Sequence, residues 1–389
     1  SLVGVRDAPM TAIEVGVSAD GALNDLRVQL SSSVGLQAEG DLNLEGETWN
    51  VIATMTEMTP SDVIPDLEPT ILSGGLNVSG TGWSLDSVRN GSLNLQLDDA
   101  VVWGESTQEI QMSSRVDAGR LEDMSLKIRH ASGEFDVSGD VDLLRSGVDL
   151  TVVTSLTDLS VWAPEWVALI EGRHTVQGTW QTPAEIEVQG DAFIADVRNE
   201  DGIGLRKATV QTQGVWTDIK TQLSNQIVVG QMQAVGVEAT DLSADVMVEL
   251  TDKGVDLQGH TTLDKAVVGD GTLELRTLSG RFQMVQDDEL FFETQEMTVG
   301  QVTLIPAQYV VDGGALQLRL DGDNLLAELH LLRNHKTFIE TLAHADITDG
   351  IWQVDELNFS PTGSQPWSLK QGFSFHLTDS GVGDMALEL

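Results

Sequence analysis

Residues 90–97 read Asn-Gly-Ser-Leu-Asn-Leu-Gln-Leu, a turn dipeptide followed by strict alternation of apolar and polar side chains. Successive side chains of a β-strand point to opposite faces of the sheet, so the three leucines share one face and the amides share the other. Asn-Gly supplies the positive-φ residues that tight hairpin turns need. The stretch therefore predicts a turn at residues 90–91 and a strand with one apolar and one polar face.

The same alternation recurs along most of the chain. The clearest other runs are 26–30, 34–38, 42–44, 49–55, 148–152, 186–188, 255–257, 273–275 and 316–320. Glu-Gly or Asp-Gly dipeptides stand between such runs at 20–21, 45–46, 201–202, 270–271, 312–313 and 321–322. Short alternating runs separated by turn dipeptides are typical of an antiparallel meander. The sequence predicts an all-β fold, with strands in more than half of the residues.

Helical signals are few. A short helix is expected at 163–171, because Pro164 occupies a favourable first helical position and Gly172 a favourable cap position. A second short piece is expected near 60–72. Residues 324–347 fit either state, since Thr337 begins a possible capping box within a segment that also alternates.

One short phrase occurs twice, at a spacing of 98 residues. The first copy has Gly74, Val78, Gly80 and Thr81, and the second has Gly172, Val176, Gly178 and Thr179. Repetition of a supersecondary unit favours an extended array over a closed globule. We interpret residues 1–389 as a single elongated β-domain, with approximate repeat units at 55–153 and 154–252.

The charge balance excludes some partners. Acidic residues outnumber basic ones 61 to 21, for a formal net charge of −40. Such a chain repels nucleic-acid phosphates, and its dispersed acids suit a salt-loving source. The chain has no cysteine, which excludes disulfides and metal-thiolate sites. No stretch approaches about 18 uninterrupted apolar residues, so the sequence predicts no membrane-spanning helix.

No motif for catalysis is present. The sequence lacks a Gly-x-Ser-x-Gly elbow, a Walker phosphate loop and a His-Glu-x-x-His motif. His330, His335 and His344 form a loose cluster that is more typical of surface histidines than of a metal site. We therefore expect no catalytic residue, no cofactor and no metal, and we do not expect an enzyme.

Four stretches resemble a known family. Residues 156–160 read Leu-Thr-Asp-Leu-Ser, 169–172 read Leu-Ile-Glu-Gly, 175–180 read Thr-Val-Gln-Gly-Thr-Trp, and 183–190 read Pro-Ala-Glu-Ile-Glu-Val-Gln-Gly. In this order they resemble the TamB/AsmA-like superfamily, the bacterial relatives of bridge-like lipid-transfer proteins. The resemblance covers about 55–216. The rest of the chain is similar to the family only in its general pattern of alternating strands. It implies a long, curved antiparallel sheet, the β-taco, whose apolar groove carries acyl chains.

The resemblance also implies a cellular setting. It implies a periplasmic conduit of a Gram-negative bacterium that carries phospholipid between the inner and outer membranes and supports outer-membrane biogenesis. An N-terminal inner-membrane anchor and a module that docks on an outer-membrane barrel-assembly-type protein belong to this setting. Neither is recognisable here, so we expect a fragment of a longer chain.

A sheet with one apolar face must close on itself, pack as a sandwich, or curl into a trough occupied by lipid. For the lipid trough, the candidate lipid-binding residues are the apolar members of the cleanest runs. These are Leu93, Leu95, Leu97, Val148, Leu150, Val152, Ile186, Val188, Leu316, Leu318 and Leu320. The alternative is a surface or adhesive structural protein of β-sandwich repeats, because the 98-residue spacing is close to the size of a sandwich domain.

Overall fold

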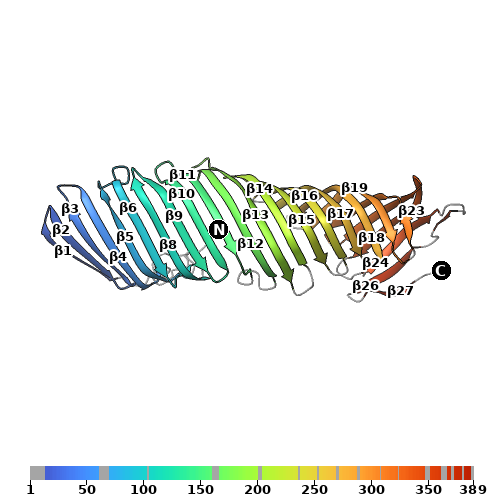
Figure 1. The fold of residues 1–389 in the computed structure, drawn as a ribbon, viewed down its shortest axis with the longest axis horizontal. Helices are drawn as coiled ribbons and strands as arrows, with labels where there is room; N and C mark the ends of the chain where they lie inside the picture. Colours follow the sequence, from blue (N-terminus) through green and yellow to red (C-terminus); the bar gives the residue numbers. More distant parts are fainter. Residues whose placement is uncertain are drawn as a thin grey trace, which may run out of the picture. The chain divides into compact units, whose positions relative to one another are not determined.

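The structure of the chain is a computed structural model (Figure 1). It describes residues 14–60, 70–102, 105–159, 166–199, 204–234, 237–251, 254–268, 271–286, 290–306, 308–322, 324–346, 351–360, 366–368, 372–378 and 381–386. Every element in these ranges is a β-strand, as the alternating sequence predicts. The described part of the chain contains no helix that could span a membrane.

The chain divides into two compact units, which are described separately. Unit 1 comprises Ser1–Pro164 and Ala168–Gly190, and unit 2 comprises Glu165–Val167 and Asp191–Leu389. The strands before the division are β1 (Val15–Ala22), β2 (Asp25–Ser32), β3 (Leu36–Asn43), β4 (Thr48–Met58), β5 (Leu72–Thr81), β6 (Arg89–Asp98), β7 (Val101–Val102), β8 (Glu105–Asp117), β9 (Arg120–His130), β10 (Gly133–Asp142) and β11 (Gly147–Leu156). Strands β12 (Trp166–Thr179) and β13 (Glu185–Asn199) contribute residues to both units.

The remaining strands belong to unit 2. They are β14 (Gly204–Thr217), β15 (Thr221–Ala234), β16 (Val237–Thr251), β17 (Gly254–Val268), β18 (Leu273–Gln286), β19 (Leu290–Leu304), β20 (Tyr309–Val311), β21 (Gly314–Asp321), β22 (Asn324–Arg333), β23 (Lys336–Asp346), β24 (Ile351–Phe359), β25 (Trp367–Ser368), β26 (Phe373–Thr378) and β27 (Gly381–Ala386). The segment at 324–347 fits helix or strand in the sequence, and its described residues, 324–346, form β22 and β23.

Strands pair antiparallel with their neighbours along the chain, in one 27-stranded sheet. In unit 1 the pairing runs from β1 through β6 to β8 and on to β12, and the short β7 pairs with β8. In unit 2 it runs from β14 through β19 to β21 and on to β24, and β20 pairs with β19. Such a row of neighbours differs from a β-sandwich, which packs two separate sheets face to face.

The predicted helix at 163–171 is wrong over its described part. Residues 163–165 lie outside the described residues, and Trp166–Thr179 is strand β12. Ile170 pairs with Leu156, and Gly172 with Thr154, on β11. The long register with β11 overrides the weak local helix preference of the segment. The other expected helical piece, near 60–72, falls mostly on residues outside the described ranges, and residue 72 begins β5.

Two expected turns lie inside strands instead. Asn90 and Gly91 belong to β6, where Asn90 has φ 49° beside a register shift between β5 and β6. Asp20 and Gly21 belong to β1, and the hairpin turn follows at residues 23–24. In β6 the positive φ that the dipeptide favours is used at this irregularity of the ladder rather than at a turn.

The two copies of the repeated phrase lie in β5 and β12. Gly74 has φ 148° and Gly178 has φ 143°, a backbone conformation that favours glycine. A Cβ at Gly74 would overlap the carbonyl oxygen of Gln96, and one at Gly178 would overlap that of Glu185. Gly74 and Gly178, which occupy different positions of the phrase, therefore each allow close approach of the next strand.

Candidate functional site

Unit 1 carries a row of directly paired apolar residues on one face of its strands, which we name strip 1. Its members are Val17, Leu30, Ala38, Ala53, Leu76, Leu95, Met112, Leu126, Val137 and Val152. Each strand from β1 to β6 and from β8 to β11 contributes one residue. At about 4.8 Å between strands, the strip runs for roughly 40 Å. It ends at β12, where Val152 pairs with His174.

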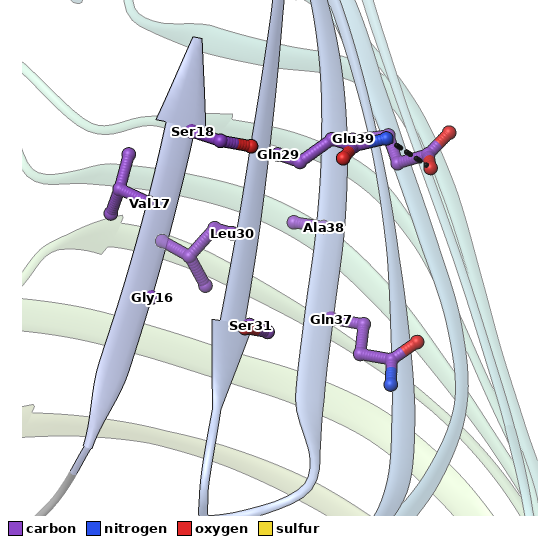
Figure 2. Close-up of a pocket in the computed structure, with 9 residues that line it drawn as sticks. All are labelled: Gly16, Val17, Ser18, Gln29, Leu30, Ser31, Gln37, Ala38 and Glu39. Carbon is purple, nitrogen blue, oxygen red and sulfur yellow. Dashed lines mark hydrogen bonds between the residues drawn. The ribbon is translucent and has the colours of Figure 1, made fainter.

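The opposite face of the same strands is polar. One residue further along each strand, a second paired row crosses the unit. Nine of its members are polar: Ser18, Gln29, Glu39, Asn77, Asn94, Ser113, Ser125, Ser138 and Thr151; the tenth is the exposed Ile52. Figure 2 shows the separation on β1 to β3, where Val17, Leu30 and Ala38 project to one side and Gln29 and Glu39 to the other. The hydrogen bond from the Gln29 amide to Glu39, 3.1 Å long, lies on the polar side.

Strip 1 is not sealed from solvent. Between β2 and β11 its side chains are half-buried, except Ala53, which is 7% exposed. The paired polar residues are mostly exposed. Because the apolar side chains keep part of their surface accessible, no described element closes over the strip. Strip 1 is an apolar surface that could hold hydrocarbon without specific hydrogen bonds.

Unit 2 carries a corresponding row, which we name strip 2. Its members are Ala208, Val229, Leu242, Leu263, Leu278, Val299, Gly314, Leu331, Ile339 and Phe359. From β19 onward it enters a closed core, which we name the C-terminal cluster. The cluster consists of Val299, Val302, Val311, Leu331 and Phe338, all between 3% and 7% exposed. Here the short strand β20 brings Val311 and Tyr309 against the sheet.

Aromatic contacts close the C-terminal cluster. The Phe338 ring lies 4.9 Å from the Phe359 ring in an edge-on arrangement and 5.5 Å from the Tyr309 ring. The Arg333 guanidinium stacks 4.4 Å from the centre of the Tyr309 ring and donates a hydrogen bond to its hydroxyl. These contacts hold β20 in place, and that part of the apolar face is therefore no longer open.

The structure places the eleven predicted residues on strands, with their side chains on the less exposed face. In unit 1, Leu95 and Val152 are members of strip 1. Leu93, Leu97, Val148 and Leu150 lie two residues or more along the same strands, and Leu97 is buried at 4% exposure against Met55 and Ala100. Ile186 and Val188 are half-buried on β13. In unit 2, Leu316, Leu318 and Leu320 are half-buried on β21.

Sequence reasoning missed several members of strip 1. Met112 on β8 and Leu126 on β9 pair directly with each other, yet neither was among the predicted residues. Both stand in runs that alternate over only a few residues. Gly74 lies two residues before Leu76, and Gly139 two residues after Val137, so that a glycine interrupts the apolar alternation of each strand. The register of the sheet, rather than the pattern within one strand, identifies them.

Ion pairs gather on the polar face. Arg129 contacts Glu109 at 2.7 Å and Glu134 at 3.1 Å, and Lys127 contacts Glu134 at 3.1 Å. The hydrogen bond from Lys127, with its charge and that of Arg129, lowers the pKa of Glu134 below its ordinary value. A lowered pKa keeps a carboxylate ionised and does not suit it to act as a general acid at neutral pH. These groups pair charges across strands.

Two histidines of the loose cluster, His330 and His344, have separate partners. His330 lies 2.9 Å from the Thr337 hydroxyl, and His344 lies 2.7 Å from the Asp355 carboxylate. Within the described ranges, no group of three or more His, Asp or Glu side chains is arranged to hold a metal ion. The described geometry thus offers an apolar surface as its main candidate site.

A scan against models of known protein families and a search of curated proteins found no match to this chain. The candidate site therefore rests on its own geometry and chemistry.

Proposed function

We propose that strip 1 binds the acyl chains of phospholipid and that the protein is a lipid conduit of the cell envelope. One observation carries this proposal. Ten strands present a directly paired apolar row on one face, and that row stays half-exposed. An open apolar surface of this length would favour aggregation unless something apolar covers it. A mobile hydrocarbon chain fits a surface that has no polar group to orient a ligand.

The dimensions support an acyl ligand. The hydrocarbon core of a bilayer is about 30 Å thick, so one layer of acyl chains spans about 15 Å. Strip 1, at roughly 40 Å, could hold more than one chain along its length. Each buried CH₂ contributes about 0.8 kcal/mol. Because neighbouring positions along the strip are chemically alike, a chain could move from one strand to the next at low cost.

The setting is part of the same proposal. The resemblance to the TamB/AsmA-like superfamily supports a periplasmic location, with the membranes as lipid donor and acceptor. In that setting the chain is anchored at the inner membrane and meets an outer-membrane barrel-assembly-type protein through segments beyond those described. The mechanism requires no catalytic residue, because transfer along an apolar surface breaks no covalent bond.

The test places a charge on the strip and a matched charge on the other face. Leu95→Asp and Leu150→Asp put a carboxylate on the apolar face of β6 and β11. Asn94→Asp and Thr151→Asp put the same charge one residue away, on the polar face. The four variants and the wild type are purified from a bacterial host, and bound phospholipid is measured by mass spectrometry of the intact protein.

We expect wild-type protein to carry phospholipid. We expect Leu95→Asp on strip 1, and Leu150→Asp two residues along β11 from it, to lose phospholipid several-fold, because a carboxylate placed among hydrocarbon must be desolvated. The two polar-face controls should retain it. A wild-type protein that takes up no lipid even from detergent-solubilised phospholipid would contradict the proposal. Equal loss in all four variants would also contradict it, since charge alone would then explain the result.

A further inference from the structure

The turns along one long edge of unit 1 form a continuous rim. Because successive strands are antiparallel, every second turn of the meander returns to the same edge. We name this edge the turn rim, and its turns are residues 23–24, 44–47, 82–88, 118–119, 143–146 and 180–184. All of these turns belong to the described part of the chain.

A backbone hydrogen bond joins each turn of the rim to the next. The amide of Leu44 donates to the carbonyl oxygen of Leu23, and the amide of Gly82 donates to that of Glu47, both at 2.7 Å. The further donor and acceptor pairs are Ala118 with Val88, Leu143 with Gly119, and Trp180 with Ser146. The turns are therefore neighbours in space. At about 4.8 Å between strands, the row from β1 to β12 is roughly 50 Å long.

Large apolar side chains are exposed along the turn rim. They are Leu23, Leu44, Trp83, Leu85, Leu143, Leu144 and Trp180, with exposed fractions between 39% and 63%. Five of the six turns contribute at least one of them. In the remaining turn, a Cβ on Gly119 would lie 2.5 Å from the Leu144 Cγ atom, so the glycine makes room for that leucine. An exposed apolar row of this kind indicates a surface that meets an apolar partner.

Hydrogen bonds hold the turns of the rim in shape. The indole N–H of Trp49 donates to the carbonyl oxygen of Gly82 at 2.7 Å, next to the exposed Trp83. The Asp142 carboxylate accepts hydrogen bonds from the backbone amides of Leu144 and Arg145, at 3.1 and 2.9 Å. Because these turns are already ordered, little conformational entropy is lost when their apolar side chains bind a partner.

The shape of the row favours one kind of partner. The exposed side chains occur in single file, with a turn about every 10 Å, since each turn spans two strand spacings. A stable interface with a protein or a second copy needs a compact patch of about 800 Å² on each partner. A bilayer surface is flat and fluid, so it accepts a straight row of separate side chains without matching their positions.

We infer that the turn rim binds the surface of a bilayer of zwitterionic phospholipid. Tryptophan favours the membrane interface, because its ring has an apolar body and a polar N–H. Glu45, Glu47 and Asp86 are exposed on the same turns of a chain with a net charge of −40, so an anionic surface would repel the rim. The inference goes beyond the proposed function, because the rim would bind a bilayer whether or not strip 1 carries lipid.

Vesicle flotation tests the turn rim with matched variants of the whole chain. The rim variant is Leu85→Ser with Leu144→Ser, two side chains that are 44% and 49% exposed. The control variant is Ile52→Ser with Ile71→Ser, two side chains of unit 1 that are 51% and 39% exposed but lie off the rim. The vesicles consist of palmitoyl-oleoyl-phosphatidylcholine, alone or mixed equally with palmitoyl-oleoyl-phosphatidylglycerol. Circular dichroism checks that both variants are folded.

We expect the wild type and the control variant to bind phosphatidylcholine vesicles equally. The rim variant should bind about tenfold more weakly, because two leucine side chains no longer leave water on binding. Phosphatidylglycerol should weaken binding of the wild type in dilute salt, and molar salt should restore it, since salt screens the repulsion.

A second measurement reports which surface touches the bilayer and does not depend on the serine variants. The chain has no cysteine, so Leu85→Cys and Ile52→Cys each provide a single site for an environment-sensitive nitrobenzoxadiazole label. When phosphatidylcholine vesicles are added, the emission of the label at residue 85 should shift to the blue. The emission of the label at residue 52 should not change.

Several results would overturn the inference. If the wild type carries phospholipid but does not float with vesicles, the rim is not a bilayer site and the proposed function stands. Equal flotation of the rim and control variants, or equal blue shifts at residues 85 and 52, would show adsorption without a preferred surface. A wild type that is dimeric by analytical ultracentrifugation and a rim variant that is monomeric would assign the rim to a second copy. If the wild type floats through the rim yet carries no phospholipid, this inference stands and the proposed function fails.

Discussion

Strip 1 and the C-terminal cluster are built from the same alternating pattern but differ in what covers them. Apart from the exposed Val17 and the buried Ala53, the side chains of strip 1 remain half-buried, whereas Val302 and Leu331 of the cluster are 6% and 7% exposed. The difference comes from β20 and the aromatic contacts of Tyr309 and Phe338. An alternating strand therefore specifies an apolar face, and a separate element decides whether that face becomes a core or stays a binding surface.

The largest effect is expected from placing the same charge in both regions. Leu331→Asp buries a carboxylate in the closed cluster and removes a packed side chain, at a cost of about 4 kcal/mol or more. Leu95→Asp, where water can reach the new group, should cost only about 1–2 kcal/mol. Melting temperature by circular dichroism compares the two, and hydrogen exchange locates the loss to β22 and its neighbours. Equal costs would show that strip 1 is as closed as the cluster.

The salt dependence of the melting temperature distinguishes the effect of burial from the effect of charge repulsion in the same two regions. Screening reduces the repulsion among the 40 uncompensated negative charges, so the melting temperature of the wild type should rise from dilute to molar salt. Leu95→Asp should follow the wild type. Leu331→Asp should stay well below both at every salt concentration, because its loss is packing and desolvation. A wild-type melting temperature that does not change with salt would show that charge repulsion does not limit the stability of the protein.

Substitution of Gly74 on β5 tests whether the close approach of β6 beside strip 1 requires a glycine. It pairs with Met55 and Leu97, two members of a small buried cluster. Gly74→Ala should cost about 1–3 kcal/mol, because φ is 148° and a Cβ would overlap the Gln96 carbonyl oxygen.

The neighbouring Gly75→Ala is the matched control for this change. The nearest atom to its Cβ would be the Ala53 carbonyl oxygen at 3.8 Å, so it should be neutral or slightly stabilising. Urea unfolding measures both variants. A cost at Gly75 equal to that at Gly74 would contradict the steric argument.

The smallest effect on stability is expected for a change on the polar face. That face is in contact with solvent whether or not the apolar face is covered. Lys265 contacts Glu274 at 2.9 Å, and its hydrogen bond is the main reason that the pKa of Glu274 lies below the ordinary 4.5, with Arg276 the next contributor. A lowered pKa stabilises the fold above the unfolded-state value, and this contribution is lost as pH falls through the folded-state value. Lys265→Met should raise the pKa of Glu274 toward 4.5 and flatten the acid-side loss of stability.

Carboxylate NMR titration gives the pKa directly. Because the Lys265 side chain is 39% exposed, solvent screens the ion pair, and melting temperature near neutral pH should change little. A pKa of Glu274 that is unchanged in Lys265→Met would assign the lowering to Arg276 instead.

Strand content and the identity of the apolar face could be predicted from the sequence because alternation is a local signal. Leu95 and Leu150 were assigned to the apolar face from their own runs, and the paired register confirms that they face the same way as their neighbours. The helix at 163–171 was predicted wrongly because its local cues, Pro164 and Gly172, compete with a register set by a distant part of the chain. Met112 and Leu126 were missed because direct pairing across strands is not visible within either strand.

By itself the sequence determined the class of fold, the polarity of the two faces and the absence of recognisable catalytic motifs, since each follows from residue type and short-range spacing. The tertiary structure alone decided which residues meet across strands and that β20 seals one end of the apolar face in unit 2. These depend on register and on contacts between segments far apart in the chain. A one-residue slip in register would exchange the two faces of a strand, and no local pattern records which register the sheet adopts.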